Sequence, residues 1–138
     1  MTNYESIFNQ ISESIKAKAE KCALSLEASG FQSDVSLNTD EDNWAFVIDV
    51  KNHPSMPRIS FVLHENDYSD GDPSFDPNNV YAHLSIVGFG GEYIGEMNGK
   101  ETQDTASLIS DFESFSDVGI VSAIQQSKTS SLKSKTMN

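Results

Sequence analysis

The chain of 138 residues has few basic residues, one cysteine and no long apolar run. The single cysteine, Cys22, excludes an internal disulfide, and no Cys/His spacing of the zinc-binding kind occurs. No apolar run approaches the roughly 18 residues that a bilayer-spanning helix needs, and the N-terminal MTNYESIFNQ lacks the regions of a signal peptide. We therefore expect a cytoplasmic protein that does not enter a membrane.

The chain also lacks the short motifs that mark common catalytic sites. It has no Gly-x-Ser-x-Gly elbow and no HExxH pair. The glycine-rich GFGGEY (88–93) lies between two predicted strands, whereas a phosphate cradle opens a helix. Because the chain has 21 acidic residues, some pair of carboxylates is always available, so such a pair does not indicate a catalytic site. The sequence thus predicts no catalytic residue, no cofactor and no enzymatic activity.

Acidic residues dominate the charge of the chain. Nine basic residues against 21 acidic ones give a net charge of −12. Between Asp40 and Ile124 the imbalance reaches −13, with Lys51, Arg58 and Lys100 as the basic residues. Such a surface repels nucleic acids and anionic membranes, because binding either of them needs lysine or arginine. A basic protein is the natural partner, and acidity that serves only solubility is the alternative.

A long amphipathic helix is predicted from about residue 3 to residue 28. Thr2 and Glu5 have the spacing of a capping box. Gly30 follows the predicted helix at the position where a residue with a left-handed backbone conformation commonly ends a helix. Cys22 lies on the apolar stripe, so we expect a buried and unreactive thiol. The stripe consists of residues at three- and four-residue spacing: Tyr4, Ile7, Phe8, Ile11, Ile15, Ala19, Cys22, Ala23 and Leu26.

After Gly30 the apolar period changes to two, which predicts strands. Gly90-Gly91 is predicted as a two-residue hairpin turn that places Gly88 opposite Tyr93 and Ile86 opposite Gly95. Ile94 then falls on the half-polar face of the sheet. The predicted strands contain Val35 and Leu37, then residues 44–50, 59–63, 80–89 and 92–97.

Helical spacing returns at residues 102–115, and a short last helix follows with Asp117 as its N-cap. Residues 127–138 have almost nothing to bury and are predicted to form a flexible tail after one domain, residues 1–126. This order predicts an α+β two-layer sandwich. A sheet of about five mainly antiparallel strands is covered on one face by the terminal helices, and its other face is uncovered.

The stretch ENDYSDGDPSFDPNN (65–79) is the least ordinary part of the sequence. It does not fit an EF-hand, because Tyr68 and Pro77 occupy ligand positions when Gly71 is aligned as the loop glycine. An irregular calcium site and a solvated turn remain alternatives. Aromatic residues among the acids favour a contact surface for a basic partner. With the acids of the 40–42 segment, the predicted contact residues are Asp40, Glu41, Asp42, Asp67, Tyr68, Asp70, Asp72, Phe75 and Asp76.

Two histidines offer a further possibility. His64 and His83 become diagonal neighbours, with Tyr81 beside them, if the strands around the acidic segment form a hairpin. Such a pair can bind a metal or transfer protons, but needs a third ligand or an orienting carboxylate, so no metal site is assigned. The alternative is two partly exposed strand histidines. His53, in a proline-rich loop, has less support as a site.

Charge and shape together favour a non-enzymatic protein-binding module. We expect an inhibitor, an immunity protein or a phage counter-defence protein that masks a basic surface of its partner, such as a surface that binds nucleic acid. The first alternative is an acidic secretion chaperone that dimerises through the uncovered sheet face. Its size, charge and first helix are similar in outline to type III secretion chaperones, but residues 65–79 show no middle helix. The second alternative is a metal-binding or enzymatic domain that uses the acidic segment with His64 and His83.

Overall fold

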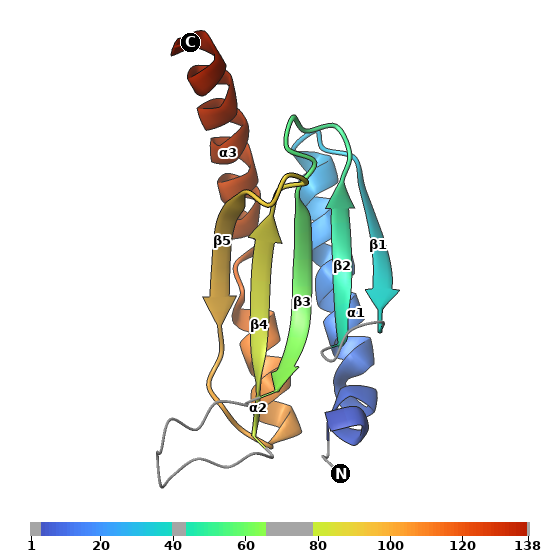
Figure 1. Ribbon diagram of the computed structural model, residues 1–138. Coiled ribbons are helices and arrows are strands. Elements are labelled where there is room, and N and C mark those ends of the chain that lie inside the picture. The colour runs from blue at the N-terminus through green and yellow to red at the C-terminus, as the bar shows by residue number, and fades with distance from the viewer. Residues whose placement is uncertain (1–3, 40–43, 66–78, 138) are drawn as a thin grey trace, which may run out of the picture.

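The computed structural model describes residues 4–39, 44–65 and 79–137, with side chains as far as residue 127. Its five strands form one antiparallel sheet in chain order, and the helices cover one face of it (Figure 1). This arrangement confirms the predicted α+β sandwich. The elements are α1 (Tyr4–Ala28), β1 (Ser33–Asn38), β2 (Trp44–Val50), β3 (Arg58–Glu65), β4 (Val80–Val87), β5 (Tyr93–Asn98), α2 (Thr105–Ser114) and α3 (Asp117–Met137).

Helix α1 ends as the sequence predicts. Gly30 has φ of +94°, and the N–H of Phe31 donates to the carbonyl of Leu26 while the N–H of Gly30 donates to that of Glu27. This pair of bonds satisfies two carbonyls at the helix end, and the buried Phe31 and Leu26 accompany it as the apolar contact. The predicted capping residue Thr2 lies outside the described residues.

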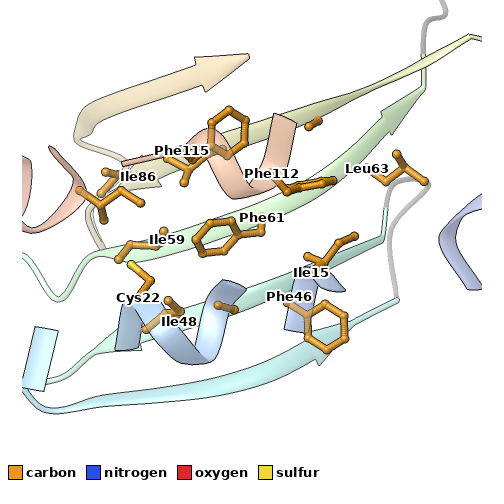
Figure 2. Close-up of a cluster of buried hydrophobic side chains, with 14 of the residues drawn as sticks. Ile15, Cys22, Phe46, Ile48, Ile59, Phe61, Leu63, Ile86, Phe112 and Phe115 are labelled. Atoms are coloured by element: carbon orange, nitrogen blue, oxygen red, sulfur yellow. The ribbon is translucent and has the colours of Figure 1, made fainter. Parts of the chain in front are cut away.

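The core lies between the sheet and the three helices (Figure 2). Alternate residues of the central strands enter it, among them Phe61, which is fully buried in the middle of β3. The thiol of Cys22 is also buried there, as predicted, and burial raises its pKa to about 12. Leu37 belongs to the apolar alternation that predicts β1 but is 51% exposed, because β1 is an edge strand and has a neighbour on one side only.

The turn between β4 and β5 differs from the prediction. Phe89, Gly90 and Gly91 form a three-residue loop, closed by the N–H of Gly88 donating to the carbonyl of Glu92 over 2.7 Å. Gly91 has φ of +88°, which three-residue hairpin loops use.

A register shift beside this loop corrects the predicted pairing. Tyr93 pairs with Val87 instead of Gly88, whereas the pairing of Ile86 with Gly95 is as predicted. The extra residue, Ile94, is partly buried against the core, so the prediction that it lies on the half-polar face was wrong.

The C-terminal helices are capped by side chains. Asp104 accepts a bond from the N–H of Ser107 at the start of α2. At the start of α3 the cap is Ser116, whose hydroxyl accepts from the N–H of Gly119 over 3.0 Å, and not the predicted Asp117. Asp117 is the first helical residue and points to Lys18 instead.

Helix α3 continues to Met137, through the segment for which the sequence predicts a tail. In Figure 1 its last turns extend past the end of the sheet. The domain boundary at residue 126 stays a prediction.

The buried hydroxyl of Tyr4 and the buried thiol of Cys22 predict how the stability of the protein changes at alkaline pH. The hydroxyl of Tyr4 donates to the carbonyl of Leu63 and accepts from the N–H of Trp44, and burial raises its pKa, as burial does for Cys22. A group whose pKa is raised by folding stabilises the protein below its unfolded pKa and loses that contribution as pH rises. We therefore expect the urea midpoint to fall above about pH 9, where unfolded cysteine and then tyrosine ionise.

Urea denaturation at several pH values between 8 and 10.5 measures this effect. Cys22→Ala and Tyr4→Phe each remove one of the two groups, so the slope against pH should become shallower in each variant. A midpoint that stays constant to pH 10.5 in the unsubstituted protein would contradict the assignment.

Candidate functional site

The strands that flank both acidic segments end at the same edge of the sheet. β1 ends at Asn38 and β2 begins at Trp44, while β3 ends at Glu65 and β4 begins at Val80. Because all neighbouring strands are antiparallel, the last residues of β1 and β3 and the first residues of β2 and β4 lie at one edge of the sheet (Figure 1). The predicted contact residues 40–42 and 67–76 themselves lie outside the described residues, so their roles stay predictions.

The uncovered face of the sheet carries mostly small and polar side chains. Its middle row crosses all five strands through residues that pair across the sheet: Ser36, Val47, Ser60, Ser85 and Glu96. Val47 is only 2% exposed, although the described helices lie on the other face of the sheet (Figure 1). The face is therefore more polar than an obligate dimer interface usually is.

Of the three basic residues between Asp40 and Ile124, Lys51 and Arg58 are paired with acidic residues of the sheet. The guanidinium of Arg58 donates from Nε and Nη2 to the carboxylate of Asp49 over 2.8 and 3.1 Å. Lys51 forms an ion pair with Asp34. Both pairs lie where β1 begins, β2 ends and β3 begins, which is opposite to the edge where β1 and β3 end.

His64, Tyr81 and His83 form one cluster on the uncovered face, as the hairpin hypothesis predicted. His64 pairs directly with Tyr81 across β3 and β4, and its ring stacks on the tyrosine ring with centroids 4.9 Å apart. His83 is the diagonal neighbour, and the two imidazole centroids lie 5.7 Å apart at 80°. The register thus brings the two histidines together.

Each imidazole of this cluster uses its Nδ1 atom for a hydrogen bond. Nδ1 of His64 lies 2.8 Å from the carbonyl oxygen of Glu65, and Nδ1 of His83 bonds to the Oδ1 atom of Asn98. Both partners are acceptors, so Nδ1 is the donor in each ring, and in the neutral imidazole this leaves the lone pair on Nε2. The carboxylate of Glu96 lies 4.0 Å from Nδ1 of His83.

His53 is a structural residue. It is 5% exposed, and its Nδ1 accepts from the N–H of Ser55 while its Nε2 lies 3.0 Å from the carbonyl oxygen of Ile124. Because Nδ1 accepts, the proton is on Nε2 and donates to that carbonyl. The ring therefore ties the loop before β3 to α3.

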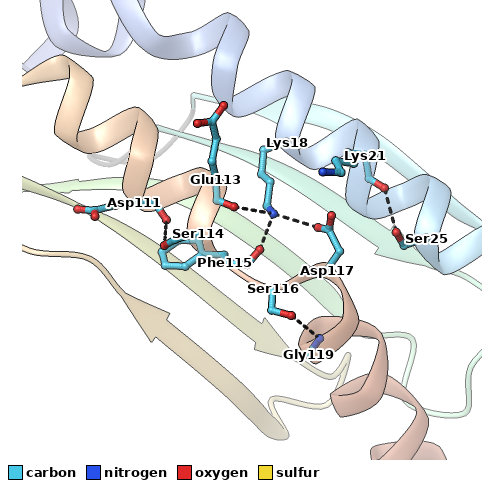
Figure 3. Close-up of polar contacts among 10 residues, drawn as sticks. All are labelled: Lys18, Lys21, Ser25, Asp111, Glu113, Ser114, Phe115, Ser116, Asp117 and Gly119. Carbon is cyan, nitrogen blue, oxygen red and sulfur yellow. Dashed lines mark hydrogen bonds and ion pairs between the residues drawn. The ribbon is translucent and has the colours of Figure 1, made fainter.

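Lys18 is the charged residue that sequence reasoning missed. It lies on the buried face of α1 at 6% exposure, and its ammonium donates to the carbonyls of Glu113 and Phe115 and pairs with Asp117 at 3.1 Å (Figure 3). Its burial could have been predicted from its position on the apolar stripe, three residues after Ile15 and four before Cys22. The cluster joins three helices and is structural.

The described ranges lack two features, a three-residue metal site and a membrane-spanning helix. No three histidine, cysteine, aspartate or glutamate side chains there are placed to hold a metal ion together. None of the helices in those ranges has the length and apolar character to cross a membrane.

Comparison with known proteins gives no relative. No family model, curated protein or solved structure matches this chain. Function must therefore be argued from its own residues.

Proposed function

We propose that the protein is a non-enzymatic binding module that masks a basic surface of a partner protein, in the manner of an inhibitor, immunity or phage counter-defence protein. The observation that carries the proposal is the charge of two segments whose flanking strands share one edge of the sheet. The segments contain eight acidic residues and no basic one: Asp40, Glu41, Asp42, Glu65, Asp67, Asp70, Asp72 and Asp76.

Electrostatics then sets the kind of partner. A concentration of one sign of charge accelerates encounter with the opposite sign and makes the association sensitive to salt. A groove that normally holds nucleic acid is basic and accepts acidic groups at close spacing. Tyr68 and Phe75 add the aromatic area that binding sites use as anchors.

Charge reversal in the longer segment tests the proposal. In the variant Asp70→Lys, Asp72→Lys, Asp76→Lys, affinity for the partner should fall on the order of a hundredfold at low salt, because attraction becomes repulsion. The partner is identified by capture on the immobilised protein from the lysate of its native host at low and high salt. Its affinity for the protein and the variants is then measured across salt concentrations.

A matched control is Glu13→Lys, Glu20→Lys, Glu27→Lys, since these exposed residues of α1 change the net charge equally on the helical layer. This control should retain most of the affinity. Equal losses in both variants, or an affinity that does not depend on salt, would refute the proposed surface. Light scattering on the free protein adds a second readout, its oligomeric state. A dimer that captures a secreted protein even at high salt would favour the chaperone alternative.

A further inference from the structure

The uncovered face holds a second chemical feature, separate from the acidic segments. His64 and His83 belong to two neighbouring strands of the sheet, β3 and β4, and their register fixes the rings beside each other. The His83 side chain is 18% exposed, so the cluster is accessible to a small ion.

The hydrogen bonds of the two rings have the form found around metal-binding histidines. A metal-bound histidine usually donates its other ring N–H to a carbonyl, a carboxylate or an amide oxygen, which fixes the tautomer and directs the lone pair to the ion. Both Nδ1 atoms here are bonded in that way, to Glu65 and Asn98.

The ring separation also fits. Two imidazoles bound to one ion through nitrogen at about 2.0–2.1 Å have centroids roughly 5 to 6 Å apart. The observed separation of the His64 and His83 centroids, 5.7 Å, lies within this range.

We propose that His64 and His83 form a two-histidine site for a divalent transition-metal ion that prefers imidazole, namely Zn²⁺, Ni²⁺ or Cu²⁺, with water at the remaining positions. Ca²⁺ and Mg²⁺ prefer oxygen ligands and are not expected there. Cu²⁺ should bind most tightly of the three, following the general order of divalent-ion affinities. The inference does not depend on the proposed protein partner.

Nuclear magnetic resonance of the histidine side chains in the full chain tests the site directly. Without metal, His64 and His83 should show the Nδ1–H tautomer and His53 the Nε2–H tautomer. Addition of Zn²⁺ should shift the His64 and His83 signals and leave those of buried His53 in place. Mg²⁺ should shift none of them.

Titration calorimetry with Zn²⁺ and Ni²⁺ gives the energetic test. His64→Gln and His83→Gln each remove a ligand and should lower the metal affinity by at least about 10–100-fold, which is the loss typical of removing a residue that only hydrogen-bonds a ligand. Asn98→Ala removes such a residue and should lower the affinity by about tenfold. The acid-neutralised control Glu13→Gln, Glu20→Gln, Glu27→Gln should bind as the unsubstituted protein does.

The opposite results would overturn the site. These are histidine signals that do not respond to Zn²⁺, or an affinity that survives both histidine substitutions. A metal affinity lost only on neutralising Asp67, Asp70, Asp72 and Asp76 would assign the ion to the acidic segment instead.

Discussion

Replacing Lys18 with alanine is expected to lower the free energy of unfolding by about 3–5 kcal/mol, the cost of breaking a buried ion pair by removing one partner. The lysine is 6% exposed and Asp117 is 13% exposed, so water cannot replace the lost ammonium freely. The substitution also leaves the carbonyls of Glu113 and Phe115 without their donor at the end of α2. Urea denaturation followed by circular dichroism measures the loss.

The same helix supplies a control for this substitution. Lys21 is exposed on α1 one turn further on (Figure 3), so Lys21→Ala should change stability by no more than about 0.5 kcal/mol. The double variant Lys18→Met, Asp117→Leu removes both charges and should recover part of the loss, since no unpaired carboxylate remains. If Lys18→Ala and Lys21→Ala had equal effects, the buried cluster would have no special energetic role.

The second large effect is expected at the centre of the sheet. Phe61 is fully buried in β3, opposite Phe46 on β2 and Leu84 on β4. Phe61→Ala removes the whole ring from a packed layer under the helices (Figure 2), and such truncations cost about 3–5 kcal/mol through lost burial and the cavity left behind. Chemical denaturation at neutral pH gives the change in unfolding free energy.

Phe89 provides the matched comparison, because its side chain is 82% exposed at the tip of the β4–β5 turn. Phe89→Ala should therefore change stability by no more than about 0.5 kcal/mol. A loss at Phe89 similar to that at Phe61 would mean that the turn side chain packs in solution and that the assigned core is incomplete.

Several elements were predictable because their signal is local. The stripe from Tyr4 to Leu26 repeats at the helical period, and Gly30 is a residue that adopts the left-handed conformation without strain, so the length and end of α1 followed from the sequence. The strands followed from a period of two, and short connectors made antiparallel neighbours the natural arrangement.

Errors arose where local signals compete. Gly90-Gly91 fits a two-residue turn, but the bond from Gly88 to Glu92 and the bond from Phe89 to the carbonyl of Ser55 favour a loop one residue longer. Ser116 and Asp117 are both good caps, and the ion pair with Lys18 leaves the capping position to Ser116. In each case a contact with a distant part of the chain decides between two local solutions.

The sequence by itself determined the class of fold, the extent of most elements, the burial of Cys22 and the acidic character of the chain, because periodicity, turn residues and charge are properties of short segments. Only the tertiary structure decided that the strands flanking both acidic segments end at one edge, that His64 and His83 adjoin, and that Lys18 is buried with Asp117. These facts depend on strand order, register and helix packing. The alternation of apolar and polar residues keeps both histidines off the core face, but a shift of two residues in the β3–β4 register would preserve that alternation and change the side chain opposite each of them.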